Sequence, residues 1–303
     1  MTVIYHRADF DGLFSAAVCK KFLPDANLIG WNFGDPLVPF PAEGQVYVVD
    51  LPPDCIEGVS PETTGFVNER LTWIDHHKSS IDRYGDVFQG YRIDGVAACR
   101  LCWQWFKRKE DRKPLPGLDD YRLRRVDEPL ALRLAGEYDV WDKRDERADP
   151  FQFGLRARHD DFLKEADYYL DERYSGLHAS LGTTETLSAV NIGRWIMRWQ
   201  HDFAKGAASR MGFIRKWEGR TFFVLVSAHA YNSTWFPNDT IPPECDALMC
   251  WRYNGEKVTF SLYHAPGHEE HDLSPIAVKY GGGGHRGACG FSMSLEDALE
   301  VIR

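Results

Sequence analysis

Imidazole and carboxylate side chains follow three short apolar segments of the sequence, each with the composition of a buried β-strand. Such side chains are costly to bury unless they bind a ligand or one another. Oxygen and nitrogen donors without cysteine favour a hard or borderline divalent ion such as Mn²⁺ or Mg²⁺ over a structural zinc. The residues that follow the three segments are His6, Asp9 and Asp11, then Asp50, and then Asp75, His76 and His77.

The apolar segments alternate with helical patterns, which is typical of a mostly parallel, doubly wound α/β sheet. Because the carboxyl ends of parallel strands meet at one crevice of such a sheet, residues far apart in sequence can lie together there. The sequence therefore predicts a single metal site at these strand ends. We predict strands at 3–5, 28–31, 46–49 and 72–74 and helices at 13–22 and 96–107.

A fourth segment offers two further acids. A helical pattern at 121–135 runs into Asp139 and Asp142, which lie three residues apart. Both follow the end of the same expected helix, so the pattern alone leaves both as candidates.

The order of these motifs resembles that of a known family. Residues 75–77, Asp-His-His, are the signature of the DHH phosphoesterase superfamily, and the His-x-x-Asp-x-Asp-Gly run at 6–12 and Asp50 are similar to its first and second motifs. Each motif alone is weak evidence, but their combination in this order is specific.

A glycine-rich run near the end of the chain resembles the motif of the companion DHHA1 domain, so the resemblance covers most of the sequence. Glycine lets a backbone approach an anion closely, and the imidazole and guanidinium that follow bind phosphate directly. The alternative interpretation is a flexible turn before a strand at 288–293. The predicted substrate-binding residues are Gly282, Gly283, Gly284, His285 and Arg286.

The resemblance implies two divalent ions in the first domain, commonly Mn²⁺, with Mg²⁺ or Co²⁺ as alternatives. Such a pair activates a water and stabilises both oxygens of an in-line displacement at phosphorus. Asp139 matches the family pattern better than Asp142. The implied ligands are His6 and Asp9 for one ion, Asp11, His76 and Asp139 for the other, and Asp50 as the bridge.

Two further residues are implied to be catalytic. His77 would face the scissile phosphate, and Asp75 would orient an imidazole rather than bind an ion directly. The alternative for His77 is a histidine satisfied by hydrogen bonds in the core. His285 and Arg286 would reach across a cleft to a second phosphate or a terminal nucleotide. The chain departs from the family pattern at Tyr263, where many relatives carry arginine.

The length of 303 residues favours two domains. We predict a DHH catalytic domain at 1–185, a connecting helix at 186–212 and a smaller mixed-sheet DHHA1 domain at 213–303. The pattern predicts strands at 221–227, 247–253 and 258–263, and Asn254-Gly255 predicts a hairpin turn between the last two. Residues 108–120 are expected to form a surface loop, 162–169 and 273–280 helices, and a final helix begins at Ser294.

Composition restricts the partners. There are 36 Lys and Arg against 45 Asp and Glu, a net charge of −9, which argues against a broad surface for long nucleic acids. The start lacks a leader pattern, and no apolar run is long enough to span a membrane. Seven scattered cysteines suit a reducing compartment. We therefore expect a cytoplasmic protein that acts on small nucleotides, and a homodimer is compatible with this.

The resulting hypothesis is a metal-dependent hydrolase of short oligoribonucleotides, linear or cyclic dinucleotides, or 3′-phosphoadenosine 5′-phosphate. One alternative is a RecJ-like single-strand 5′ exonuclease, which needs a basic, aromatic-lined channel. Another is a nucleotide-binding sensor that has lost catalysis. An inorganic pyrophosphatase is disfavoured, because that branch of the family lacks the glycine-rich run.

Two other groups of donor side chains are weaker candidates for a metal site. Residues 264–271 are rich in histidine, but Pro266-Gly267 and the adjacent acids predict an exposed loop, with adventitious metal binding as the alternative. Pairs of cysteines at 99 and 102 and at 245 and 250 offer zinc ligands, although the first pair lies in an expected helix.

Overall fold

The computed structural model describes residues 1–303 except 64, 143, 159–161, 172–181, 227–234, 237–238, 266, 269 and 303. The chain divides into two compact units, Met1–Ile196 and Met197–Arg303. The division falls within the long helix α9 (Thr184–Met211), which occupies nearly the same residues as the predicted connecting helix. No helix among the described residues combines the length and apolar character that a bilayer crossing requires.

The first unit is built on a parallel sheet of five strands in the order β2-β1-β3-β4-β5, which confirms the predicted α/β fold class. Four of the five strands were expected. The sequence Gln89-Gly90-Tyr91-Arg92 lacks an apolar run, and for this reason β5 was missed. The strands are β1 (Thr2–His6), β2 (Asn27–Trp31), β3 (Val46–Val49), β4 (Leu71–Asp75) and β5 (Gln89–Arg92).

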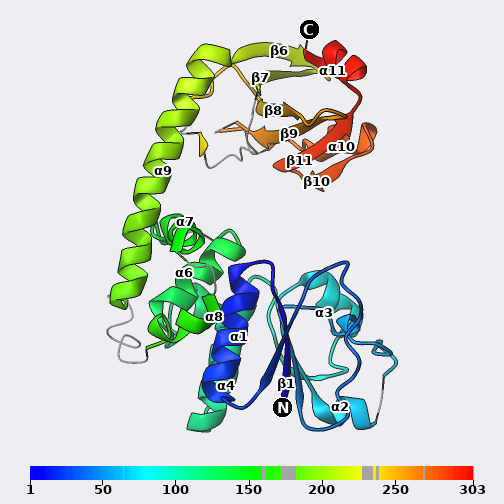
Figure 1. The fold of residues 1–303 in the computed structure, drawn as a ribbon, viewed down its shortest axis with the longest axis vertical. Coiled ribbons are helices and arrows are strands. Elements are labelled where there is room, and N and C mark those ends of the chain that lie inside the picture. The colour runs from blue at the N-terminus through cyan, green and yellow to red at the C-terminus, as the bar shows by residue number, and fades with distance from the viewer. Residues whose placement is uncertain are drawn as a thin grey trace. The chain divides into compact units, whose positions relative to one another are not determined.

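Helices cover both faces of this sheet. Figure 1 shows α1 and α4 on one side of β1 and α2 and α3 on the other. Alternate strand residues explain the two layers, because Val3 and Val49 pack into one core cluster and Ile4 and Val48 into another. The helices are α1 (Phe10–Phe22), α2 (Phe66–Arg70), α3 (Lys78–Tyr84), α4 (Ala98–Asp111), α5 (Leu118–Arg122), α6 (Leu130–Asp139), α7 (Ala148–Arg158) and α8 (Phe162–Glu165), with 3₁₀ turns at Pro53–Cys55 and Ala166–Tyr168.

The single helix predicted at 121–135 is wrong. The segment contains the end of α5 and the start of α6, separated by Pro129, which precedes the first residue of α6. Proline cannot donate the hydrogen bond that would continue a helix, and it is well suited to helix starts. The predicted loop at 108–120 is also too long, because α4 continues to Asp111 and α5 begins at Leu118.

The strand order identifies where ligands are expected. The chain passes from β1 to β2 on one side and returns with β3 on the other side of β1. Ligands of open α/β sheets bind beside the carboxyl ends of strands at such a reversal of order. The residues that follow β1 and β3 therefore occupy the expected binding position.

The second unit contains a mixed sheet of six strands in the order β10-β11-β9-β8-β7-β6. Helices α10 and α11 pack on one face, where Ile276 and Ala298 join Phe260 in a core cluster. The predicted end of one strand, Ser227, lies outside the described residues. The elements are β6 (Phe213–Trp217), β7 (Arg220–Val226), β8 (Ala247–Tyr253), β9 (Val258–His264), α10 (Ser274–Lys279), β10 (Gly283–His285), β11 (Ala288–Met293) and α11 (Leu295–Ile302), of which β6 and β10 were not expected.

Candidate metal centre

The turn between β1 and α1 positions the first donors. His6 is the last residue of β1, and the Asp9 carboxylate caps α1 by accepting a hydrogen bond of 3.0 Å from the amide of Gly12. A Cβ atom at Gly12 would lie 1.9 Å from the carbonyl oxygen of His6. Only glycine fits here, which explains its place in the His-x-x-Asp-x-Asp-Gly run.

Asp11 is buried in the first turn of α1. Its carboxylate accepts hydrogen bonds of 2.8 and 2.7 Å from the backbone amides of Ala98 and Cys99. These amides belong to the N-terminus of α4, whose dipole favours a negative charge. A second helix therefore holds this carboxylate in place.

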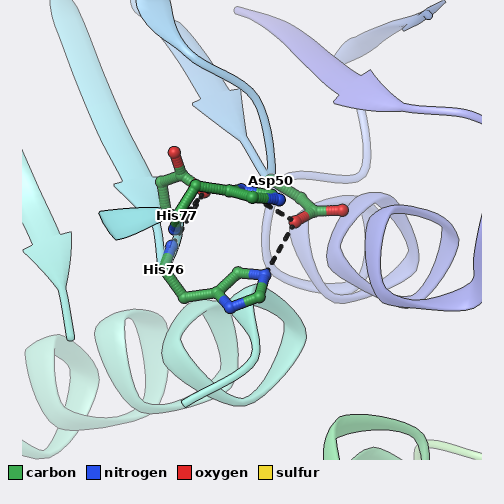
Figure 2. Close-up of side chains that lie close together, drawn as sticks. Asp50, His76 and His77 are labelled. Carbon is green, nitrogen blue, oxygen red and sulfur yellow. Dashed lines mark hydrogen bonds and ion pairs between the residues drawn. The ribbon is translucent and has the colours of Figure 1, made fainter. Parts of the chain in front are cut away.

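Asp50 lies between the donors of β1 and those of β4. It follows β3 directly, is only 2% exposed, and has a φ angle of 57°. Aspartate tolerates this left-handed conformation better than most residues. Its Oδ2 lies 3.5 Å from Nδ1 of His6, and its Oδ1 lies 3.4 Å from Nε2 of His76. Figure 2 shows the contacts of the Asp50 carboxylate with His76 and His77.

His76 faces three carboxylates at once. Its Nε2 lies 3.4 Å from an oxygen of each of Asp11, Asp50 and Asp139. These separations are longer than normal N–H···O hydrogen bonds. Asp139, the last residue of α6, is brought to this group, whereas Asp142 pairs with Arg144 at 2.6 Å.

The six predicted ligands form two groups of three. The donor atoms within each group lie within 4.8 Å of one another, and each group combines imidazole nitrogen with carboxylate oxygen. The two oxygens of Asp50 face an imidazole of each group. That these residues bind metal stays a prediction. The groups are His6, Asp9 and Asp50, and Asp11, His76 and Asp139.

Asp75 fixes the orientation of His77. The fully buried Asp75 accepts hydrogen bonds at Oδ1 from the amide of His76 at 2.8 Å and from Nδ1 of His77 at 2.7 Å. The bond to Asp75 raises the pKa of His77. The side chain of His77 is 45% exposed, so this imidazole is oriented by the core but open to solvent. The catalytic roles of both residues stay predictions.

The electrostatics of the cluster match a cation site. Burial, reinforced by the Asp50 charge, raises the pKa of Asp11 to about 7, and burial with the Asp11 charge raises the pKa of Asp139 to about 7. Hydrogen bonds to Asp50 and Asp9 raise the pKa of His6 to about 10. Bound protons thus balance several closely spaced carboxylates.

His76 responds in the same way. Burial lowers the pKa of this imidazole, but the nearby Asp50 carboxylate and the charge of Asp11 outweigh burial and raise the pKa to about 10. Among the described residues, the buried Oδ1 of Asp50 has no hydrogen-bond partner. A divalent cation would satisfy this oxygen and replace the protons, so the residues fit such an ion.

Asn32 was missed by the sequence analysis. Its Oδ1 lies 3.2 Å from Nε2 of His6. The amide oxygen accepts a hydrogen bond from Nε2–H, so Nδ1 is the nitrogen directed at Asp9 and Asp50, and it could bind a metal ion once the ion displaces its proton. The available signal was its position, because Asn32 directly follows the predicted strand at 28–31, as the other site residues follow their strands.

The predicted phosphate-binding residues form an exposed hairpin in the second unit. Strand β10 pairs antiparallel with β11, and Gly282–Arg286 are exposed. The guanidinium of Arg286 donates a 2.6 Å hydrogen bond to the carbonyl oxygen of Glu270. The hairpin therefore presents an imidazole and a guanidinium at its turn.

Packing requires glycine at two positions of this hairpin but not at the third. A Cβ at Gly282 would lie 2.0 Å from the carbonyl oxygen of Gly290, and one at Gly284 would lie 2.6 Å from Cα of Cys289. Strand pairing thus requires both. A Cβ at Gly283 would meet no atom within 4 Å. Internal packing leaves the space over Gly283 open.

The cysteine alternative receives no support. All seven cysteines are free and buried, and no donor group among the described residues contains one. Burial raises the pKa of Cys99 and Cys102, which keeps their thiols protonated.

Comparison with known proteins finds similarity in structure but not in sequence. No protein-family model matches the chain, and no curated protein matches it in sequence. Among solved structures, the pGpG-specific phosphodiesterase PggH of Vibrio cholerae has a TM-score of 0.54 and 14% identity, over 99% of this chain and 96% of that chain.

Two other solved structures are similar at lower TM-scores. The DHH domain of a member of a family of ribosomal proteins has a TM-score of 0.49 and 14% identity over 99% of this chain and 85% of that chain. Manganese-bound exonuclease RecJ has a TM-score of 0.45 and 13% identity over 99% of this chain and 87% of that chain.

The fold and the site define a two-unit α/β protein with a candidate divalent-metal centre at parallel strand ends. The likeness to the phosphodiesterase extends over both units. The chain therefore shares the fold of that phosphodiesterase.

Proposed function

We propose that this chain is a divalent-metal-dependent phosphoesterase that hydrolyses short nucleotides. The observation that carries the proposal is the Asp50 carboxylate, whose two oxygens face imidazoles of two separate donor groups. A bridging carboxylate between two ligand sets is the arrangement that a pair of ions requires. We prefer Mn²⁺, with Mg²⁺ or Co²⁺ as alternatives, because the donors combine imidazole with carboxylate.

The bound ions would supply Lewis-acid chemistry and an activated water for attack at phosphorus. The chain's own residues would orient the substrate and manage protons. His77 would contact the scissile phosphate through its exposed ring, since the bond from Nδ1 to Asp75 leaves Nε2 available. Asp75 would fix the tautomer and the direction of that imidazole.

The glycine-rich hairpin would bind a second phosphate. Gly283 leaves room for an anion at the backbone, and His285 and Arg286 provide exposed donors beside it. The net charge of −9 offers little attraction to a long strand. The structurally similar protein that acts on pGpG, a linear dinucleotide, supports a substrate of this size. We therefore place linear dinucleotides first among the candidate substrates.

A substrate panel tests this function. It contains pGpG, oligoribonucleotides of increasing length, cyclic dinucleotides, 3′-phosphoadenosine 5′-phosphate and pyrophosphate, each with Mn²⁺ and with Mg²⁺. We expect kcat/KM to peak at about two to four nucleotides, the span of one small binding module. Equal or higher kcat/KM on a long single strand would favour the exonuclease instead. Tight binding without turnover of any substrate would favour a sensor.

A further inference from the structure

The second unit contains another cluster of metal-ligating side chains. Asp246 directly precedes β8, and His268, Glu270 and His271 lie in the segment between β9 and α10. One donor atom from each of Asp246, His268 and His271 lies within 4.8 Å of the other two. All four residues belong to the same compact unit.

The backbone brings the two imidazoles to one side of this segment. The amide of His268 donates to the carbonyl of Ala265 at 3.1 Å, and the amide of His271 donates to the carbonyl of His268 at 3.3 Å. The two rings are stacked with centroids 5.7 Å apart. The amide of Ala265 also donates to the carbonyl of Asp246 at 3.3 Å, which ties the segment to the start of β8.

Four separations describe the cluster. Oδ1 of Asp246 lies 3.9 Å from Nδ1 of His268 and 3.6 Å from Nε2 of His271. Oε1 of Glu270 lies 3.9 Å and 3.4 Å from the same two nitrogens. All exceed the usual 2.7–3.2 Å of N–H···O hydrogen bonds, so these side chains face one another without a bond of that kind.

The four imidazole-to-carboxylate separations can be compared with the edges of a coordination tetrahedron. Zinc bonds of about 2.0–2.2 Å to nitrogen and oxygen give ligand-to-ligand edges of about 3.3–3.6 Å. The four separations of 3.4–3.9 Å are at most a few tenths of an ångström wider, which side-chain rotation can close.

Asp246 is held as metal-binding carboxylates are. Its Oδ2 accepts a 2.7 Å hydrogen bond from the amide of Thr221, and its own amide donates to the carbonyl of Thr221 at 2.8 Å. These bonds fix the carboxylate and leave Oδ1 directed at the histidines.

We propose that Asp246, His268 and His271, with Glu270 as the fourth ligand, form a zinc site. Two imidazoles and a carboxylate within 4.8 Å of one another, with a second carboxylate within 3.9 Å of both imidazoles, favour Zn²⁺ over Mg²⁺ or Ca²⁺, which prefer six or more oxygen ligands. This site shares no residue with the candidate metal centre of the first unit. Its existence does not depend on the proposed phosphoesterase activity.

The site would position Arg286. The carbonyl oxygen of Glu270, between the two histidines and adjacent to His271, accepts the hydrogen bond from the Arg286 guanidinium. A zinc ion bound to this segment holds that carbonyl in one place and so reduces the freedom of the guanidinium. This second part rests on the proposed role of Arg286 in phosphate binding.

Zinc stoichiometry tests the site without any substrate. The full-length chain with Asp50→Asn, which weakens the candidate metal centre, is loaded with Zn²⁺, passed through gel filtration and measured by elemental analysis. Adding His271→Ala should remove one zinc per chain, whereas adding His201→Ala, a histidine of α9 outside the cluster, should remove none. An equal zinc content with and without His271 would overturn the proposal.

Two further measurements keep the result interpretable. If His271→Ala disturbs folding, as judged by circular dichroism, Asp246→Asn replaces it and should also cost one zinc per chain. Titration with Zn²⁺ should show affinity at this site reduced by about a hundredfold or more in either variant. Unchanged affinity in both would exclude the site.

A kinetic measurement separates the positioning role from zinc binding. In the otherwise unchanged chain, His271→Ala should raise KM for nucleotides that carry a second phosphate while kcat stays the same. Loss of zinc with unchanged KM would leave the metal site standing and overturn its link to Arg286.

Discussion

The candidate metal centre and the glycine-rich hairpin differ in how far their polar side chains are buried. The centre contains two carboxylates, Asp11 and Asp50, that are almost completely buried, and Asp11 is held by the backbone amides of Ala98 and Cys99. The hairpin uses exposed side chains on a short strand pair, where the Arg286 guanidinium donates a hydrogen bond to the backbone of Glu270.

In the proposed function, this difference would separate chemistry from recognition. Reactive groups must be held within a fraction of an ångström, and buried donors with fixed partners achieve that. A surface that selects among nucleotides tolerates more freedom. We therefore expect substitutions at the centre to reduce kcat and metal content, and substitutions in the hairpin to raise KM.

The largest effect is expected for Asp50→Asn. Asparagine tolerates the positive φ of this position, so the variant removes the charge without adding backbone strain. Metal content should fall and kcat should drop by about a thousandfold or more, since metal ions supply several kcal/mol at the transition state. Asp54→Asn, which removes a surface pairing with Arg83, is the control and should change neither. Full metal content in Asp50→Asn would contradict the bridging role.

Asn32→Ala should have the next largest effect. Loss of the oxygen that orients His6 should weaken metal binding or activity by about 10- to 100-fold, the usual cost of removing such a partner. Added Mn²⁺ should restore most of the activity, and Asn32→Asp, which keeps an oxygen acceptor, should lose less. Equal losses in both variants, measured by activity against metal concentration, would argue against the orienting role.

Arg286→Ala tests whether the hairpin binds a second phosphate. A charge-assisted bond to phosphate contributes about 1.5–3 kcal/mol, so KM for nucleotides with a second phosphate should rise by about 10- to 100-fold with little change in kcat. Arg252→Ala, an exposed arginine on β8, is the matched control. A fall in kcat at constant KM would break the division between the two regions.

Gly283→Ala should give the smallest change. Its added methyl group meets no atom of the chain, so Tm should stay the same. If phosphate approaches the backbone there, the methyl group should remove about 0.5–1.5 kcal/mol of substrate-binding free energy and raise KM by about two- to tenfold. Gly255→Ala, at a turn with a φ of 100°, should instead lower Tm and leave KM unchanged. An unchanged KM in Gly283→Ala would remove the backbone contact from the proposal.

Much of the first unit could be predicted from sequence, because its central strands are continuous apolar runs that end in polar residues. The donors His6, Asp50 and His76 were found for this reason. The strand β5 and Asn32 were not found, since β5 lacks an apolar run and a single asparagine has many uses. The choice of Asp139 over Asp142 needed the family pattern, and the structure places only Asp139 beside His76.

The second unit was harder to predict in detail. Glycine disfavours strands, so a run of glycines concealed β10, whose backbone pairs with β11. Metal binding at 264–271 was only an alternative in the sequence analysis, and Asp246 was not expected to join these histidines. His268 and His271 are close in sequence, but Asp246 reaches them only through the pairing of β8 with β9, which spacing along the chain does not reveal.

The hydrogen bonds between Asp11 and α4 connect two segments 87 residues apart. A cation that binds Asp11 keeps its carboxylate negatively charged, and this charge is stabilised by the amides at the start of α4. The cation therefore also favours the state in which α4 is docked on α1. Cation binding and the docking of α4 are then linked equilibria. The amide protons of Ala98 and Cys99 should consequently exchange with solvent more slowly when the ion is bound, because local opening of that helix would have to release it.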